Sequence, residues 1–303
     1  VFTQLLNDIK KKCFFSFDLE TTSLDYIEAE IVGISFALES KKSFYIPLSH
    51  IDESKYKQLP IKYVLENFKS ILEDKKIKKV GHNLKYDRNV LLNYKINLKG
   101  IQHDSMLLSY VYDSTAIRHG LDNVAEKYLS HKTIHYEDVA GKGVKQIPFS
   151  EVDIDVAAEY SCEDAIISLE LYNYLWEKVS KDKNIIKIYS DIEIPLMPIL
   201  SDIERNGVLI DSKKLNKLSK ELEKELNEIQ KKCFEITKKK FNLNSPKQLQ
   251  EILYIDLKIP IFKNTPTGKP STDEDTLQFL SQSHKLPELI LDYRSLNKLK
   301  TGY

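Results

Sequence analysis

The chain has 303 residues, in which 45 Lys and Arg balance 45 Asp and Glu, so its net charge of zero favours no nucleic-acid partner by itself. A hydrophobic share of 42% and a charged share of 30% are typical of globular proteins, and this length predicts two domains. No apolar run approaches the roughly 18–20 residues of a membrane span, and no signal pattern opens the chain, so no membrane partner is expected. Three widely spaced cysteines argue against a disulfide framework or a zinc site and for a reducing compartment.

An apolar strand is predicted at residues 14–22, and two acidic residues, Asp18 and Glu20, lie inside it. Side chains two positions apart on a strand point to the same face, so the two carboxylates lie side by side. Because adjacent negative charges are costly to bury, the pair favours a divalent cation such as Mg²⁺ or Mn²⁺ between them. The alternative is a strand with one solvated edge, on which both acids face water.

The rest of the first part predicts a mixed sheet with flanking helices, which is an α/β fold. Strands at 30–38 and 43–48 follow across short turns as an antiparallel meander. A strand at 77–80 leads into a helix capped by Asn83, and this crossover implies a parallel pairing. The predicted helices lie at 61–73, at 84–94, in two pieces within 104–130 broken near 114–120, and at 151–179, where Ser150 and Asp153 resemble a capping box; 131–148 is predicted as a loop.

A Lys-rich segment at 181–189 is the predicted domain boundary, and the part that follows is largely helical. Pro195 and Pro198 lie in a helix that ends at Asn206-Gly207, after which residues 208–210 are predicted as a short strand. A long amphipathic helix is predicted at 212–240, with a coiled coil or spacer arm as the alternative. Shorter helices are predicted at 246–254, 273–282 and 287–301.

Two further acids complete a candidate metal site. Asp87 falls in the first turns of the helix that follows Asn83, and Asp164 lies four residues after Tyr160 in the helix at 151–179. The i,i+4 spacing places Tyr160 and Asp164 on one helix face. Other candidates are weaker: Asp104 is predicted as a helix cap, and His131 with His135 has metal-ligand spacing but no thiol partners nearby.

Three segments resemble the motifs of DEDD-type 3′–5′ exonucleases that use a tyrosine: Phe17-Asp-Leu-Glu-Thr21, Gly81-His-Asn-Leu-Lys-Tyr-Asp87 and Tyr160-Ser-Cys-Glu-Asp164. The likeness extends to the proofreading domain of family A DNA polymerases and to the start of their polymerase domain. Further similar segments lie at 114–119, 131–134, 140–143, 203–208, 242–249 and 292–299. The resemblance therefore covers essentially the whole chain.

The resemblance implies a ribonuclease H-like exonuclease domain at 1–182 and a truncated palm-base and thumb region at 190–303. It implies two divalent cations, Mg²⁺ or Mn²⁺, held by Asp18, Glu20, Asp87 and Asp164, with Asp18 bridging both ions. Tyr160 would orient the attacking water. Contacts to the DNA strand would come from Leu24, Asn83 and Arg118.

The implied activity is the removal of nucleotides from single-stranded or frayed DNA 3′ ends as proofreading during DNA replication. A primer–template would lie along the thumb region, and the protein would be a monomer. The polymerase catalytic residues are absent from this chain. Two alternatives stay open: a catalytically silent DNA-binding scaffold, and an RNase D-like RNA 3′ exonuclease.

The Lys-, Asn- and Ile-rich composition is typical of an AT-rich genome. Within the family, this makes the chain look most like the apicoplast polymerases of malaria parasites. The expected location is therefore the plastid (apicoplast) or another organelle, with the bacterial cytoplasm as the alternative.

Overall fold

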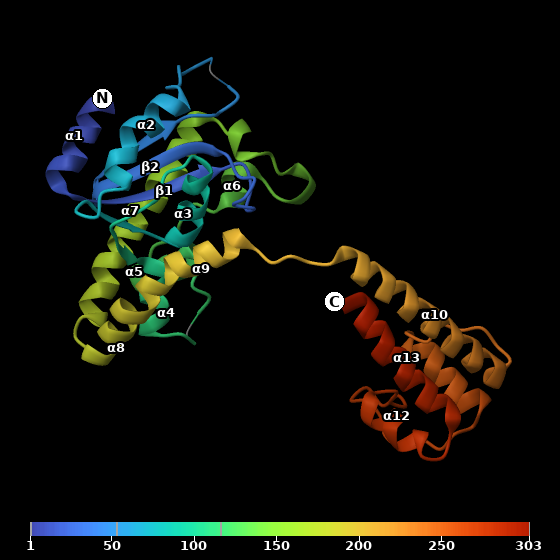
Figure 1. The fold of residues 1–303 in the computed structure, drawn as a ribbon. Coiled ribbons are helices and arrows are strands. Elements are labelled where there is room, and N and C mark those ends of the chain that lie inside the picture. The colour runs from blue at the N-terminus through green and yellow to red at the C-terminus, as the bar shows by residue number, and fades with distance from the viewer. Residues whose placement is uncertain (1, 53, 116, 303) are drawn as a thin grey trace. The chain divides into compact units, whose positions relative to one another are not determined.

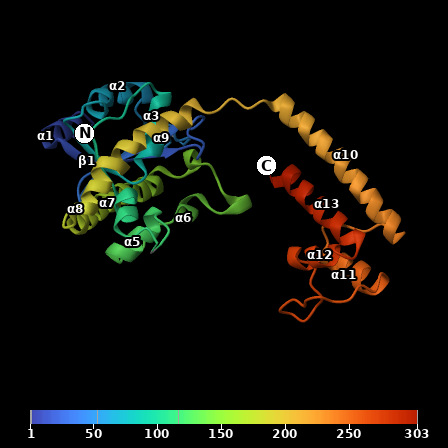
Figure 2. The same ribbon diagram turned by 60° about the horizontal axis from the view of Figure 1, so that its bottom comes forward.

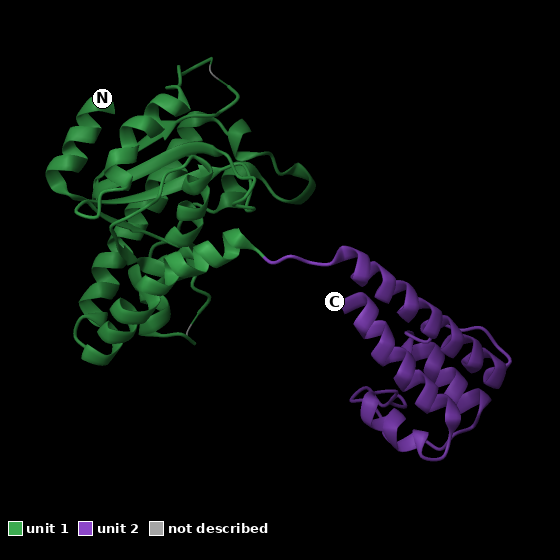
Figure 3. Ribbon diagram, in the orientation of Figure 1, with its two compact units in different colours: residues 1–207 green, residues 208–303 purple. Residues whose placement is uncertain are grey.

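The computed structural model describes residues 2–52, 54–115 and 117–302, and the chain forms two compact units, residues 1–207 and 208–303 (Figure 3). Ala116, inside the predicted break between two helices, lies outside the described residues. Each unit has its own hydrophobic core.

The first unit is built on a five-stranded sheet in the order β3-β2-β1-β4-β5 (Figure 1). β1 pairs antiparallel with β2, and β2 antiparallel with β3, whereas β1–β4 and β4–β5 are parallel. The predicted mixed sheet is therefore confirmed, although its edge strand β5 was not predicted because four residues are too few for a clear alternation. The bounds are β1 Phe14–Thr21, β2 Ile31–Glu39, β3 Lys42–Pro47, β4 Lys78–Gly81 and β5 Ile101–Asp104.

Helices cover both faces of this sheet. One face of β1 presents Phe15, Phe17 and Leu19 to a core shared with α1, α2 and α3. The other face is covered by the 26-residue helix α7, which contacts β1, β2, β3 and β4. In Figure 2 the labels of α7 and α2 lie on opposite sides of β1. The helices of this unit are α1 Phe2–Lys12, α2 Ile61–Leu72, α3 Leu84–Asn93, α4 Ser105–Tyr112, α5 Leu121–Leu129, α6 Tyr136–Ala140, α7 Ile154–Val179, α8 Lys183–Ile188 and α9 Ile194–Asn206.

The start of α7 differs from the prediction. Asp153 is its cap, because its carboxylate accepts hydrogen bonds from the backbone N–H groups of Asp155 and Val156. Ser150 lies in a separate 3₁₀ turn, so the predicted capping box with Ser150 was wrong. The preceding segment, predicted as a loop, contains the short helix α6 and a second 3₁₀ turn, Gly143–Lys145.

Residues 183–207 belong to the first unit, although the second domain was predicted to begin at residue 190. Tyr189 is buried in a π-helical turn, and its hydroxyl accepts a hydrogen bond from the backbone N–H of Asp104. Arg88 of α3 binds Asp202 of α9 at 2.8 Å. The chain then passes to the second unit at Gly207, whose φ of 62° favours glycine. The predicted strand at 208–210 is not formed; this segment is extended, exposed and unpaired.

The second unit is helical, as predicted. α10 packs against α13, and α11 and α12 complete a core around the buried Cys233. The predicted apolar stripe of α10 is buried at Leu226 but exposed at Leu215 and Leu218. The bounds are α10 Ser212–Thr237, α11 Pro246–Gln250, a π-helical turn Glu251–Asp256, α12 Glu274–Ser281 and α13 Lys285–Gly302.

The buried carboxylate of Asp104 joins two helix starts. As predicted, it caps its own helix, α4, by accepting the N–H groups of Met106 and Leu107. It also accepts the N–H groups of Asn83 and Leu84 at the start of α3. Asn83 occupies the predicted cap position, but its backbone is left-handed and its side chain makes no capping hydrogen bond. The cap of α3 therefore comes from a distant strand end.

We expect Asp104→Ala to lower the free energy of unfolding by about 3 kcal/mol, because four buried or part-buried N–H groups lose their acceptor. Trp176 is the single tryptophan and lies 4.4 Å from the His103 ring, so its fluorescence during urea unfolding reports on this unit. Asp182→Ala removes a single exposed cap and serves as the control, with an expected loss of about 1 kcal/mol. Equal losses for the two variants would contradict the double role of Asp104.

Candidate metal centre

Strand β1 presents its two acids to the face that α7 covers. Asp18 and Glu20 alternate with the core residues Phe17 and Leu19, which point to the opposite face. In the register with β2, Asp18 lies opposite Ser35 and Glu20 opposite Gly33. Glu20 is buried and Asp18 half-buried, so the alternative of a solvated strand edge was wrong.

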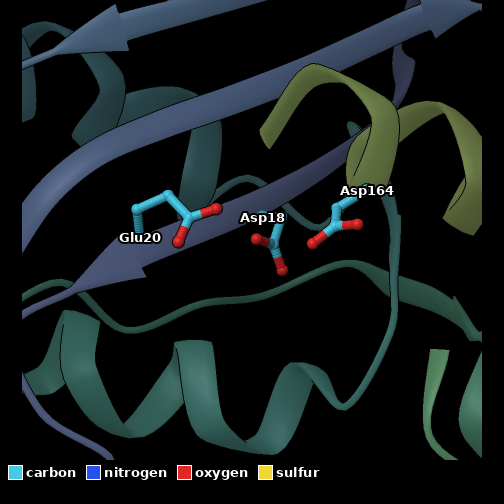
Figure 4. Close-up of side chains that lie close together, drawn as sticks. All are labelled: Asp18, Glu20 and Asp164. Atoms are coloured by element: carbon cyan, nitrogen blue, oxygen red, sulfur yellow. The ribbon is translucent and has the colours of Figure 1, made fainter. Parts of the chain in front are cut away.

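Helix α7 brings the third carboxylate to this face. Asp164 is buried, and its carboxyl group points toward those of Asp18 and Glu20 (Figure 4). One carboxylate oxygen from each of the three residues lies within 4.8 Å of the others. A cluster of this size has the donor set and spacing that a hard divalent cation requires.

Asp87 of α3 contacts β1 next to the cluster. It lies in the first turn of α3, and its Oδ1 accepts the Leu19 N–H at 3.1 Å. This N–H is available because the parallel pairing of β1 with β4 ends at Ser16. Asp87 is buried and close enough to Asp18 for the Asp18 charge to raise its pKa, although it is not part of the three-carboxylate group.

The burial of these acids strongly disfavours their charged forms. Desolvation raises the pKa of Asp18 to about 7. Desolvation, with the nearby Asp18 charge, raises the pKa of Glu20 to about 8, against the lowering effect of a hydrogen bond from Ser161. Desolvation and then the charge of Asp18 raise the pKa of both Asp87 and Asp164 well above the usual range. The ionised Asp18 carboxylate therefore destabilises the ionised forms of the other three.

The donor set fits a cation. Oδ1 of Asp164 is buried and has no hydrogen-bond partner. Across residues 2–52, 54–115 and 117–302, no Lys, Arg or His forms an ion pair with any of the four carboxylates. Oxygen-only donors match Mg²⁺ or Mn²⁺ better than a metal that prefers nitrogen or sulfur.

Tyr160 lies beside the cluster as a packed, protonated phenol. Its ring packs 6.0 Å from that of Phe149, and Asp164 lies one helical turn further along the same face of α7. Desolvation first, and then the charges of Asp164, Glu20 and Asp18, raise its pKa far above the usual value. A neutral phenol donates a hydrogen bond but is a poor ligand for a hard cation.

The three predicted DNA-contact residues lie outside the carboxylate cluster. Leu24 is 93% exposed, in the turn that follows β1. Arg118 is exposed between α4 and α5, and it has no hydrogen bond or ion pair within the described residues. Asn83 borders a hollow of about 460 Å³, whose lining is Tyr26, Asn83, Lys85, Tyr86, Asn89 and Glu204.

Two residues near the site were missed in the sequence. Tyr86 bonds Thr21 at 2.5 Å and donates to the Ser23 carbonyl, which holds the turn that carries Leu24. Ser161 donates to Glu20 at 2.7 Å. The only signal for either was its place inside a motif, Tyr86 next to Asp87 and Ser161 next to Tyr160.

The histidines that had metal-ligand spacing are engaged elsewhere. His131 pairs with Glu163 at 2.7 Å, and His135 pairs with Asp122 at 2.9 Å. The two rings therefore bind different acidic partners. A shared metal site at these histidines has no support in the described residues.

Both parts of the chain match known protein families. Residues 2–180 match the family model described as 3′–5′ exonuclease, and residues 212–303 match that of DNA polymerase family A. In a structural comparison, the chain is similar to the POL domain of Pol1 from M. smegmatis in complex with DNA primer–template and dNTP. The TM-score is 0.77 at 21% identity, with 99% of this chain and 48% of that chain covered, which shows a shared fold.

Bacterial relatives are similar over the whole chain. DNA polymerase I of Pseudomonas aeruginosa is 43% identical over 305 residues, which cover 100% of this chain and 33% of that protein. DNA polymerase I of Borreliella burgdorferi is 35% identical over 302 residues, or 99% of this chain and 32% of that protein. The chain thus spans about a third of the length of these relatives.

The raised carboxylate pKa values predict that the metal-free protein loses stability as the pH rises. The folded-state values of about 7 for Asp18 and 8 for Glu20 exceed the unfolded values of about 4. This contribution to the free energy of unfolding is fully present below pH 4 and is lost as the pH rises through 7 and 8. Mg²⁺ binds the ionised carboxylates, so it should raise the melting temperature at pH 8.5 and barely at pH 5.5.

The measurement is thermal unfolding in EDTA and in MgCl₂ at both pH values. The reference is the Asp18→Asn, Glu20→Gln variant. It retains His82 and His103, whose pKa values are lowered by desolvation, so their contribution to the pH dependence cancels in the comparison. Relative to this variant, the metal-free protein should be less stable at pH 8.5 than at pH 5.5. A Mg²⁺ stabilisation equal at both pH values would contradict binding at these carboxylates.

Proposed function

The chain belongs to the 3′–5′ exonuclease family that its residues 2–180 match, with the start of a family A DNA polymerase region at 212–303, and from this premise we propose its activity. We propose that the first unit is a metal-dependent 3′–5′ exonuclease that removes nucleotides from DNA 3′ ends. Its role would be proofreading within a longer DNA polymerase. The proposed domains are 1–182 for the exonuclease and 190–303 for the partial polymerase region.

One observation carries the proposal: Asp18, Glu20 and Asp164 place carboxylate oxygens within 4.8 Å of one another, without an ion pair among the described residues. Asp87 adds a fourth acid through its bond to the Leu19 N–H. Two divalent cations bound at such a site activate water and stabilise the attacking and leaving oxygens of a phosphodiester. The ions proposed are Mg²⁺ or Mn²⁺.

The roles proposed for the protein side chains follow from their positions. Asp18 lies between Glu20 and Asp164 in Figure 4, which suits a carboxylate shared by two ions. Asp87, whose Oδ1 accepts the N–H of Leu19 next to Asp18, would act on the second ion. Tyr160 lies one turn from Asp164 on α7, and as a protonated phenol it is suited to orient the attacking water rather than to act as a base.

DNA is the partner that we propose for both units. Leu24, Asn83 and Arg118 are proposed contacts to the displaced 3′ strand, supported by the exposure of Leu24 and Arg118 and by the hollow beside Asn83. The helices of 208–303 would bind the primer–template, by analogy with the similar POL domain that was solved with one. We propose a monomer for this chain.

The bacterial cytoplasm, which was the alternative in the sequence, is the location that we now propose. The relatives compared above come from bacteria, and they give no support to the plastid expectation. Within the described residues, no helix is long and apolar enough to cross a bilayer.

The rival functions are less well supported. A silent scaffold has no need for four clustered acids whose pKa values are raised by desolvation, because neutral residues would fold more stably there. An RNA 3′ exonuclease would share the carboxylates, so only its substrate separates it from the proposal. The match of 212–303 to DNA polymerase family A favours DNA.

Asp18→Asn with Glu20→Gln should abolish hydrolysis of a 3′-ended DNA oligonucleotide, because the centre loses two anionic ligands. Circular dichroism and the Trp176 fluorescence should be unchanged, since both substitutions are nearly isosteric. Mg²⁺-dependent activity retained by the double variant in a clean preparation would contradict the assignment of these carboxylates as metal ligands.

The same assay determines which substrate the protein prefers. DNA and RNA oligonucleotides of one sequence are compared, together with matched and mismatched duplex ends. Unpairing a matched end costs a few kcal/mol, and a mismatched end needs much less of this energy to release its 3′ strand. A mismatched end should therefore be degraded faster than a matched end. Equal rates on both ends would contradict proofreading, and faster RNA hydrolysis would favour the rival nuclease.

Tyr160→Phe should slow single-turnover cleavage by roughly one to three orders of magnitude, because one positioning hydrogen bond is lost. The phenyl ring keeps its packing on Phe149, so metal affinity and melting temperature should barely change. Asp164→Ala is the contrasting variant and should weaken metal binding itself. A wild-type cleavage rate for Tyr160→Phe would leave Tyr160 as a packing residue only.

A further inference from the structure

Ser161 contacts the metal centre from the helix side. It follows Tyr160 directly in α7 and is completely buried. Its Oγ donates a hydrogen bond of 2.7 Å to Oε1 of Glu20, which is itself buried. The bond joins the central strand to the helix across 141 positions of the sequence.

This hydrogen bond is the one that restrains the Glu20 carboxylate. Among the described residues no other side chain or N–H group bonds it, so its second oxygen is left for a cation. The neighbouring Tyr45 packs over Gly33, where an added Cβ would lie 2.0 Å from the Tyr45 Oη. That hydroxyl is occupied by His50 Nε2 at 2.7 Å, so Tyr45 fills space beside Glu20 without binding it.

The spacing along α7 adds a geometric consequence. Ser161 and Asp164 are three residues apart, which places them on one helix face about 5–6 Å from each other. The same face therefore supplies one ligand, Asp164, and the hydrogen bond that fixes another, Glu20. Any shift of α7 relative to β1 would disturb both carboxylates together.

We propose that Ser161 is a positioning residue of the metal centre, which fixes the Glu20 carboxylate so that its free oxygen faces the ion shared with Asp18 and Asp164. The inference rests on the proposed function, since it requires a divalent cation at these carboxylates. Hydrogen-bonded partners of metal ligands hold the ligand in its binding orientation, and their loss typically weakens metal binding 10–100-fold. Ser161 itself does not touch the ion.

The experiment is a Mn²⁺ titration of the full chain by calorimetry, without nucleic acid. Ser161→Ala removes only the hydroxyl, and we expect its Mn²⁺ dissociation constant to rise about tenfold or more. Ser168→Ala is the matched control, because Ser168 is a buried serine two turns further along the same helix. The control should bind Mn²⁺ as the unaltered protein does.

Thermal unfolding separates positioning from general packing. A positioning role lowers the increase in melting temperature that Mn²⁺ produces over EDTA, whereas a purely structural role lowers the EDTA value and leaves the increase unchanged. For hydrolysis, Ser161→Ala should need more Mn²⁺ for half-maximal rate, with a smaller loss at saturating Mn²⁺. Mn²⁺ binding as tight as in the unaltered protein would overturn the role of Ser161 alone.

The Asp18→Asn, Glu20→Gln variant distinguishes this outcome from failure of the proposed function. If the unaltered protein and this double variant bind Mn²⁺ equally, no cation binds at the carboxylates, and both proposals are overturned. If the unaltered protein binds Mn²⁺ and the double variant does not, the metal centre stands. The comparison of Ser161→Ala with Ser168→Ala then decides the role of Ser161.

Discussion

The structure depends on one electrostatic constraint, the clustering of four carboxylates, three of them buried, around a single strand, with no cationic side chain among the described residues to neutralise them. Desolvation raises the pKa values of Asp18, Glu20, Asp87 and Asp164, and the charge of Asp18 raises those of the other three further. Such an arrangement lowers the stability of the metal-free protein at neutral pH and above. A divalent cation reverses this cost, because it binds the ionised forms that the fold alone disfavours.

The scaffold places these charges on regular elements, where the backbone is held by its own hydrogen bonds. β1 is a central strand with neighbours on both sides, and α7 is a 26-residue helix across one face of the sheet. α3 is fixed at its start by Asp104 and along its length by α9 through Arg88. Sites on strands and helices hold their geometry better than sites on loops, which suits a centre that must resist its own repulsion.

The first unit contains every carboxylate of the centre, so the second unit is not needed to assemble it. α9 packs on α3 and then continues into the segment that begins the second unit, so it links the two units along the chain. The apolar residues Val208, Leu209 and Ile210 of that segment are exposed. Their sequence pattern resembles a strand, but a strand needs a hydrogen-bonded neighbour, and none is provided within the described residues.

The sequence by itself determined the elements that carry the site and the identity of its acids. Strand alternation placed Asp18 and Glu20 on one face, and the i,i+4 spacing placed Tyr160 with Asp164, because both periodicities are local properties of the backbone. Only the tertiary structure decided which face of β1 meets α7, that Asp104 rather than Asn83 caps α3, and that Ser161 holds Glu20. These features arise between residues far apart in the chain, where packing selects partners that no local pattern specifies.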